Sequence, residues 1–255
     1  MTISLDWLPA TAFTYIIMFA RIGSIMMLMP ALGEQMIPVR MRLSFALAFT
    51  LIVYPLVSDI IPAMPDALPG MLGLLFHEIA VGLIIGGIVR LTVMATQVAG
   101  AIVAFQAGLS GALAADPTQA GVQGAVFASF LSFLGITLIF ATDLHHMALA
   151  AIYDSYMVFS PSDPLMFEDA MQLAIRTIAG AFSVGVQMSA PFIVFGLVFN
   201  LGAGILARLM PQLQVYFILM PANIIIGLFL FAILLTMMMG WYIAAFENHL
   251  AMWRG

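Results

Sequence analysis

The sequence has 255 residues, of which 64% are hydrophobic and 7% are charged, and its formal net charge is -5 at pH 7. A chain this apolar cannot cover a soluble domain with polar groups, so we expect it in a lipid bilayer or inside a larger apolar assembly. The absence of cysteine excludes disulfides and thiolate chemistry, and the acidic balance without any basic run argues against a nucleic-acid partner.

Six apolar blocks predict an all-α membrane protein. The segment before the first block has neither a basic region nor a small-residue cleavage pattern, so we expect no cleaved signal peptide. Three blocks have the length of one membrane span of about 20 residues, whereas the third, fifth and sixth are too long for one straight span. We expect the third block to break at Gly86-Gly87, before Arg90. The blocks cover residues 8–29, 43–61, 71–105, 124–142, 170–200 and 213–246.

The charges between the blocks predict the orientation of the chain. The connection 30–42 carries Arg40 and Arg42, the far end of the third block carries Arg90, and the fifth connection carries Arg208. The alternate connections carry acids, most densely over residues 143–169. Because cytoplasmic loops of membrane proteins are enriched in basic residues, the arginine side is expected to face the cytoplasm. No repeat or linker divides the chain, which predicts a single domain over residues 1–255.

Among the charges inside apolar blocks, we single out one arginine and one glutamate. Arg21 lies in the first block, within FARIG, and Glu78 lies in the third, within FHEIAVG. A charge inside the membrane indicates a proton relay, a substrate contact or a buried ion pair. Only one acid lies deep enough for a relay, so we favour neutralisation of Arg21 by Glu78 or by a neighbouring subunit.

The third block also contains GLIIG, which places Gly82 and Gly86 four residues apart. Small residues at this spacing let helix backbones approach closely in lipid, so they predict a helix-packing face. The partner could be another subunit or another helix of the same chain, and the sequence leaves both open.

A histidine doublet, His145-His146, follows Asp143 and raises the question of a metal site. Adjacent histidines project in different directions from a helix, and no third ligand has suitable spacing. We therefore expect a solvated helix end, with no metal ion, no other cofactor and no catalytic residues.

The segment FQAGLSGALAADPTQAGVQGA, residues 105–125, joins two apolar blocks yet is almost free of charge. Small neutral residues suit a loop that packs inside a protein cavity at membrane depth, where an ordinary solvent loop would carry more charges. We predict a gate-like segment, with a bland surface loop as the alternative. The candidate gate residues are Phe105, Gln106, Gly108, Leu109, Ser110 and Gly111.

A polar stretch, RLMPQLQVYFILMP, leads into the last apolar run. Prolines remove helix hydrogen bonds and amides are costly in lipid, so we expect a turn that is surrounded by protein. Its candidate residues are Arg208, Pro211, Gln212, Gln214 and Pro221.

Several of these stretches together resemble the FliR family of flagellar export-gate proteins, which is related to a component of virulence type III secretion systems. The resemblance runs in order along nearly the whole chain, and its most specific element is P-Q-x-Q-V-x-F-x-x-x-P. The stretches are FARIG (19–23), PALGEQMIPVRMR (30–42), EIAVGLIIGG (78–87), QVAGAIVAFQAGLS (97–110), ADPTQ (115–119) and GILARLMPQLQVYFILMP (204–221).

The resemblance implies a non-enzymatic core subunit of the flagellar type III protein export gate, located in the bacterial inner membrane and flagellar basal body and projecting toward the periplasm. It implies FliP-like and FliQ-like partner subunits, an FlhB-like partner and unfolded export substrates, besides membrane lipid. It also implies kinked helical hairpins, with a FliP-like part over about residues 1–169 and a FliQ-like hairpin over residues 170–255. In the family, the loop that aligns with FQAGLS plugs the pore.

A small-solute secondary transporter is the competing prediction, because interrupted helices and the charges of Arg21 and Glu78 would suit one. Such transporters have inverted repeats and a polar cluster near the membrane midplane, and the sequence shows neither. A purely structural membrane scaffold without a gate is a third possibility.

Overall fold

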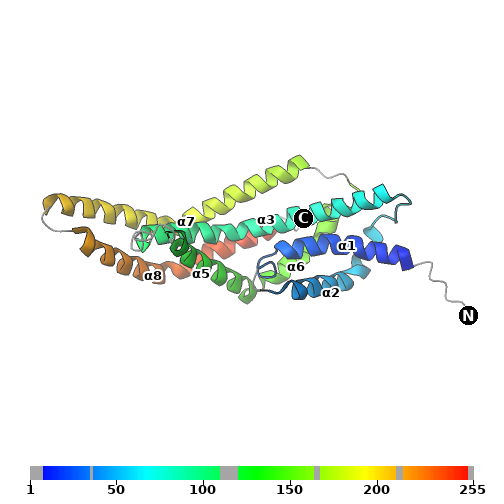
Figure 1. The fold of residues 1–255 in the computed structure, drawn as a ribbon, viewed down its shortest axis with the longest axis horizontal. Coiled ribbons are helices and arrows are strands. Elements are labelled where there is room, and N and C mark those ends of the chain that lie inside the picture. The colour runs from blue at the N-terminus through cyan, green and yellow to red at the C-terminus, as the bar shows by residue number, and fades with distance from the viewer. Residues whose placement is uncertain (1–7, 35–36, 110–119, 164–166, 211–214, 252–255) are drawn as a thin grey trace, which may run out of the picture. The chain divides into compact units, whose positions relative to one another are not determined.

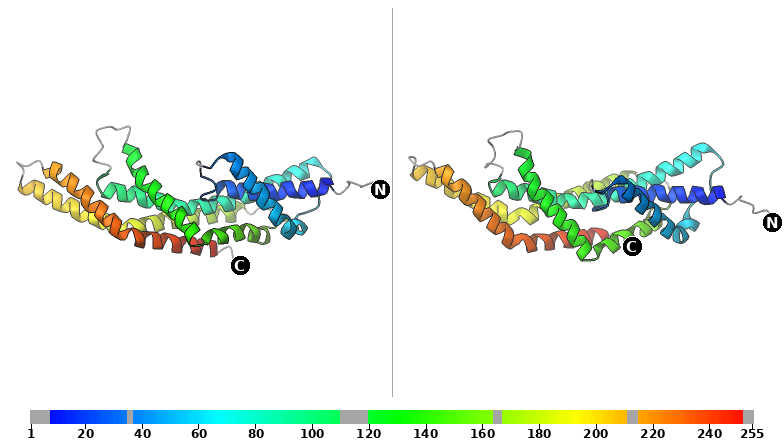
Figure 2. Two further views of the ribbon diagram at one scale, coloured as in Figure 1. Left: turned by 90° about the horizontal axis from the view of Figure 1, so that it is seen from below. Right: turned by 60° about the horizontal axis from the view of Figure 1, so that its bottom comes forward.

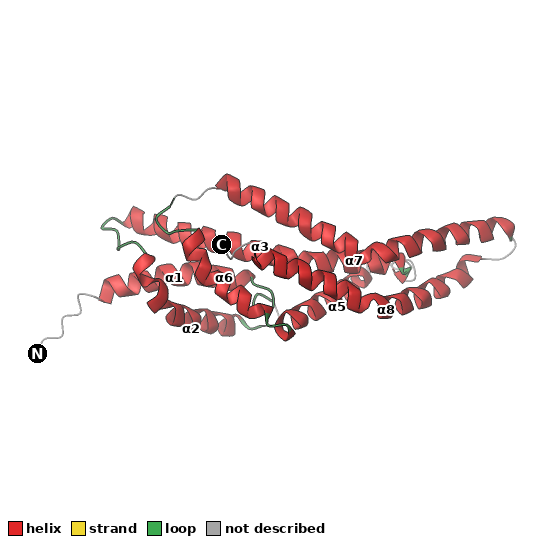
Figure 3. Cartoon of the chain, turned by 180° about the vertical axis from the view of Figure 1, so that it is seen from behind, coloured by secondary structure: helices red, strands yellow, loops and turns green. Residues whose placement is uncertain are grey.

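A computed structural model describes residues 8–34, 37–109, 120–163, 167–210 and 215–251. Every regular element in these ranges is a helix (Figure 3), which confirms the all-α prediction. The α-helices are α1 (Leu8–Leu28), α2 (Val39–Val57), α3 (Leu68–Gln106), α5 (Ala120–Ala141), α6 (Leu144–Val158), α7 (Phe167–Leu209) and α8 (Val215–Ala251), and a short 3-10 helix, η1 (Ser58–Ile60), follows α2.

The helices have the lengths of membrane-spanning segments. Five of those described are long and apolar enough to cross a membrane, or six if α5 and α6 form one bent span, so the prediction of about six hydrophobic segments is confirmed. With 39, 43 and 37 residues, α3, α7 and α8 measure about 55–65 Å at about 1.5 Å per residue. Each is therefore about twice as long as a hydrocarbon core of about 30 Å.

One predicted helix break is wrong. α3 continues through Gly86-Gly87, where the sequence predicts an interruption. The weak helix propensity of glycine is overridden by tertiary packing here, because the bare face of Gly86 lies against α1 at Ile25. Gly86 therefore marks a close helix contact.

A second correction concerns the acidic connection predicted over residues 143–169, because it contains the helix α6. The acidic residues of this segment suggest a connection, although one face of the helix is apolar. The buried residues Leu144, Ala148, Ile152 and Tyr156 recur every four positions. That spacing keeps them on one side of a helix, which faces the core.

The chain forms two compact units, each built from segments that are distant in sequence. Unit 1 comprises Met1–Leu91, Asp143–Thr177 and His249–Gly255, and unit 2 comprises Thr92–Thr142 and Ile178–Asn248. α3 and α7 each contribute residues to both units.

In unit 1, α1 supplies the central apolar stripe and lies beside α2 (Figure 1). The Tyr15 hydroxyl donates a hydrogen bond of 2.8 Å to the Leu47 carbonyl, which joins α1 to α2. The buried residues of α1 are Ile17, Met18, Arg21, Ile22, Gly23, Ile25 and Met26. A charged side chain thus sits in the middle of the apolar face of α1.

In unit 2, α7 and α8 run side by side as a hairpin in both views of Figure 2. An aromatic cluster ties this hairpin to α5. The ring centroid of Phe231 in α8 lies 5.0 Å from that of Phe127 in α5 and 6.3 Å from that of Phe192 in α7. α3 also meets α5 closely, since a Cβ added at Gly100 would collide with the backbone of Ala128.

Candidate functional site

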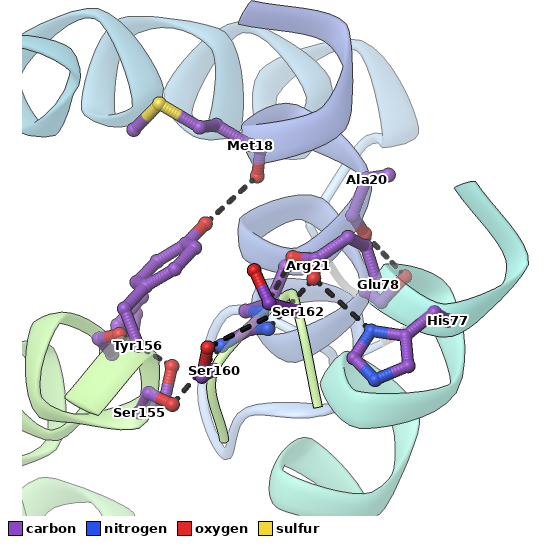
Figure 4. A network of polar contacts seen from close by, with 11 residues as sticks. Met18, Ala20, Arg21, His77, Glu78, Ser155, Tyr156, Ser160 and Ser162 are labelled. Carbon is purple, nitrogen blue, oxygen red and sulfur yellow. Dashed lines mark hydrogen bonds and ion pairs between the residues drawn. The ribbon is translucent and has the colours of Figure 1, made fainter. Parts of the chain in front are cut away.

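Arg21 and Glu78 meet in unit 1. The Nε atom of Arg21 lies 2.6 Å from Oε2 of Glu78, and the Nη2 atom lies 2.7 Å from Oε1 (Figure 4). Both side chains are 0% exposed. This two-point contact matches the planar guanidinium to the planar carboxylate, which is the strongest geometry available to such a pair.

α6 supplies the remaining partners of Arg21. The Nη1 atom donates a hydrogen bond of 3.0 Å to the Ser155 carbonyl, and the guanidinium carbon lies 4.2 Å from the centroid of the Tyr156 ring. The Tyr156 hydroxyl donates in turn to the Met18 carbonyl at 3.4 Å. Each of the three guanidinium nitrogens thus has a hydrogen-bond partner, and α1, α3 and α6 are joined through one side chain.

His77 lies at the edge of this cluster. Its Nδ1 atom is 3.3 Å from Oε1 of Glu78, and its side chain is 15% exposed. Since Arg21 already engages both carboxylate oxygens, Glu78 is charge-compensated where it stands. The geometry favours a neutralised ion pair over a proton relay.

The predicted glycine face lies next to this cluster. A Cβ added at Gly82 would lie 2.6 Å from the Arg21 carbonyl oxygen and 2.7 Å from Cβ of Ser24. One added at Gly86 would lie 2.9 Å from the Ile25 carbonyl oxygen. The close neighbour of Gly82 and Gly86 is therefore α1 of the same chain.

In unit 2, the candidate gate segment begins at the end of α3. Phe105 is 69% exposed, and Leu109 is half-buried. The backbone of Gly108 has φ +74°, in the region that favours glycine, and its N–H donates to the Phe105 carbonyl at 3.1 Å. Ser110 and Gly111 lie outside the described residues.

The three residues before Leu109 are packed closely against α7 and α8. A Cβ added at Gly196 of α7 would collide with the Gln106 side chain, and one added at Gly227 of α8 would lie 2.6 Å from Cβ of Ala107. The Asn223 side chain of α8 donates to the Gln106 carbonyl at 3.4 Å. The start of the gate segment is therefore held by small residues and one amide.

The predicted hairpin turn is described only at its edges. Arg208 lies in the last turn of α7, where a positive charge complements the helix dipole. Pro221 lies inside α8, in its second turn, rather than in the turn between the helices. Pro211, Gln212 and Gln214 lie outside the described residues.

The histidine doublet differs from its sequence-based expectation. The two imidazole rings face one another, with centroids 4.0 Å apart and planes inclined by 36°, so the prediction that they diverge is wrong. Nitrogens of His145 and His146 and an oxygen of Asp143 lie within 4.8 Å of one another. These three ligand atoms are close enough together to be candidates for one metal ion, contrary to the expectation that no third ligand lies at a suitable spacing.

The sequence pattern does not indicate several residues that complete these sites. Ser155 and Tyr156 reach Arg21 only because α6 folds back onto α1, across 134 residues of sequence. The apolar spacing of α6 is the signal that could have placed Tyr156 on a buried face. Gly227 and Asn223 lie in an apolar run in which nothing marks them as partners of Ala107 and Gln106.

A family model described as bacterial export proteins, family 1, matches residues 12–249. The chain belongs to this family. The flagellar biosynthetic protein FliR of Caulobacter vibrioides is 46% identical over 230 residues, which cover 89% of this chain and 91% of the relative. FliR of Bacillus subtilis is 28% identical over 226 residues, which cover 88% and 85% of the two chains.

The family extends to virulence systems. The Yop proteins translocation protein T of Yersinia pestis is 25% identical over 240 residues, which cover 92% of this chain and 90% of the relative. The chain is thus a FliR-type member of the bacterial export proteins and a component of flagellar type III export. This membership favours protein export over the transport of a small solute.

Proposed function

We propose that this chain is a core subunit of the flagellar type III export gate, and that residues 105–111 help to close the conduit for unfolded flagellar subunits. The observation that carries the proposal is the contrast at the end of α3. Phe105 is 69% exposed, while Ala107, two residues on, is 1% exposed and packed against α8. A bulky apolar side chain presented from a fixed base suits a constriction that excludes water and ions.

The exposed surface of α7 and α8 supports a role within an assembly. Large apolar residues on one face of α7 recur at helical spacing and are each more than 60% exposed: Val194, Leu197, Val198 and Leu201. Exposed apolar surface of this extent needs lipid or protein to cover it. FliP-like and FliQ-like subunits and an FlhB-like protein are its proposed neighbours, beside membrane lipid.

The remaining parts of the proposal concern place and organisation. The assembly lies in the inner membrane, within the flagellar basal body, and projects toward the periplasm. Residues 1–169 form the FliP-like part, and residues 170–255 form the FliQ-like hairpin, to which α8 and nearly all of α7 belong. The subunit acts without catalysis and without a cofactor, by shaping and closing a passage.

The gate is tested by a matched pair of phenylalanines. Phe105 and Phe133 are both 69% exposed in unit 2, so truncation removes a similar exposed side chain from each. We expect Phe105→Ala to make the membrane leaky to ions, while Phe133→Ala leaves its permeability unchanged. The measurement is conductance, or uptake of an excluded solute, in cells that carry the assembled complex.

Deletion of residues 108–112 is the stronger form of the same test. We expect the deleted chain to assemble and the membrane to leak more than with Phe105→Ala. Wild-type permeability in an assembled complex would show that this segment does not close the conduit. Co-purification with FliP-like and FliQ-like subunits as one detergent-stable complex tests the proposed partners, and a chain isolated alone would contradict them.

A further inference from the structure

We propose that Asn223 of α8 is a positioning residue that latches the end of α3 and so sets how readily the gate segment moves. The inference rests on the proposed gate function, because it assigns a role to the base of that segment. It concerns described residues of unit 2 only.

The Asn223 side chain lies directly against the backbone of Gly108. A Cβ added at Gly108 would lie 2.5 Å from Nδ2 of Asn223, so the asparagine amide occupies space that only a glycine leaves free. The positive φ of Gly108, +74°, independently favours glycine at this position. The amide therefore sits directly against the turn where the gate segment leaves α3.

Asn223 and its neighbour Gly227 also contact the two residues before Gly108. The same amide donates to the Gln106 carbonyl at 3.4 Å, two residues before Gly108. Between them, Ala107 is 1% exposed and faces Gly227, one helical turn beyond Asn223 on α8. Asn223 and Gly227 thus form one face of α8 that contacts three consecutive residues at and just beyond the end of α3.

The Asn223 side chain makes a hydrogen bond through its amide nitrogen but not through its oxygen within the described part of the chain. Its Oδ1 atom is buried and accepts no hydrogen bond within the described part of the chain. A buried acceptor without a donor is unfavourable, so it weakens the arrangement that contains it. One long hydrogen bond beside an unpaired acceptor holds the end of α3 without fixing it permanently, as a releasable latch requires.

The absence of cysteine in this chain allows a direct test. A single Leu109→Cys substitution places a thiol on the half-buried residue just beyond the latch. The rate of its reaction with a membrane-impermeant maleimide, measured in the complete assembled complex, reports how often this residue becomes accessible. All further variants are compared in that background.

We expect Asn223→Ala to raise the labelling rate by about two- to tenfold, the change that loss of one ordinary hydrogen bond produces in a two-state equilibrium. The matched control is Gln187→Ala, because among the described residues the Gln187 amide donates within α7, to Ser183 at 3.3 Å. The control should leave the rate unchanged. Equal rates for the two variants, with assembly and melting temperature retained, would overturn the latch.

If Asn223→Ala does not assemble, a pair of substitutions at Gly227 and Ala107 tests whether α8 holds the end of α3. Gly227→Ala alone pushes a methyl group into Ala107 and should raise the labelling rate. Adding Ala107→Gly removes the opposing methyl group and should return the rate to within about twofold of the starting value. No difference between the single and the double variant would contradict the role of α8 in holding α3.

Ion permeability measured on the same variants separates this inference from the gate function. Faster labelling together with leakage supports both. Faster labelling without leakage supports the latch and contradicts the gate, while unchanged labelling contradicts the latch whether or not the membrane leaks.

Discussion

The Arg21 cluster of unit 1 and the gate base of unit 2 join helices in opposite ways. Around Arg21, charged groups make short hydrogen bonds, and the guanidinium and the carboxylate leave no strong group unpaired. Around Gly108, helices approach through missing side chains, and the one amide makes a single bond of 3.4 Å. Breaking the Arg21 cluster would leave a buried charge uncompensated, whereas the contact around Gly108 depends on close packing and one long hydrogen bond.

The largest effect is expected at the ion pair. Arg21→Met leaves Glu78 buried without its counter-charge, and removal of one partner of a buried pair costs about 3–5 kcal/mol. We expect the purified complex to lose that much stability in thermal or denaturant unfolding, or to fail to assemble.

The double variant Arg21→Met with Glu78→Gln removes both charges and should recover a large part of that loss. Recovery would identify the uncompensated charge as the cause. If the single variant is harmless, or if the second substitution brings no recovery, the Arg21–Glu78 pair does not stabilise unit 1 in the way that distinguishes it from the contact around Gly108.

A smaller effect is expected where α1 meets α3. Gly82→Ala forces a methyl group to within 2.6 Å of the Arg21 carbonyl oxygen, and overpacking of this kind costs about 1–3 kcal/mol. Gly87, five residues on in the same helix, has nothing within 4 Å of an added Cβ. Gly87→Ala should therefore stabilise α3 by about 0.5–1 kcal/mol through helix propensity alone.

Unfolding of the two variants, measured side by side in detergent, sharpens the comparison. Opposite signs would show that close approach, rather than the loss of a glycine as such, determines the stability of this contact. Equal changes would mean that α1 and α3 do not pack as closely as their backbones indicate.

The smallest effect is expected from a pair of buried tyrosines. Tyr156 and Tyr242 are each 1% exposed, but only the Tyr156 hydroxyl has a partner among the described residues, the Met18 carbonyl. Tyr156→Phe should cost about 0.5–1.5 kcal/mol, whereas Tyr242→Phe should be neutral or slightly stabilising, because it removes a buried unpaired group. A larger loss at Tyr242 would indicate a partner subunit that bonds its hydroxyl in the complex.

Composition and hydrophobic blocks were sufficient to predict the helical class and the number of long apolar segments, because an apolar chain in lipid must satisfy its backbone within helices. They were insufficient at Gly86-Gly87. Local propensity predicts a break there, but α1 packs against Gly86 and the helix continues. Helix boundaries in such chains depend on contacts that no local window contains.

The candidate sites likewise contain residues that the sequence indicates and residues that it does not. Arg21 and Glu78 stand out in the sequence because charges are rare in apolar blocks. The structure places Nε of Arg21 2.6 Å from Oε2 of Glu78. Tyr156 has no such local contrast, and although Asn223 is an amide in an apolar run, nothing local shows what it contacts. Their roles arise from helices that are brought together across 138 and 117 residues of sequence.

The sequence separation of the ion pair has a consequence for biogenesis. Glu78 is synthesised 57 residues after Arg21, a delay of about 3–11 s at about 5–20 residues per second. Until then α1 carries an uncompensated arginine, which opposes insertion by about 2.5–3.5 kcal/mol at a helix centre. The Arg21 side chain therefore gains its counter-charge only after α3 has been synthesised, so α1 reaches its final environment together with a helix that follows it in the chain.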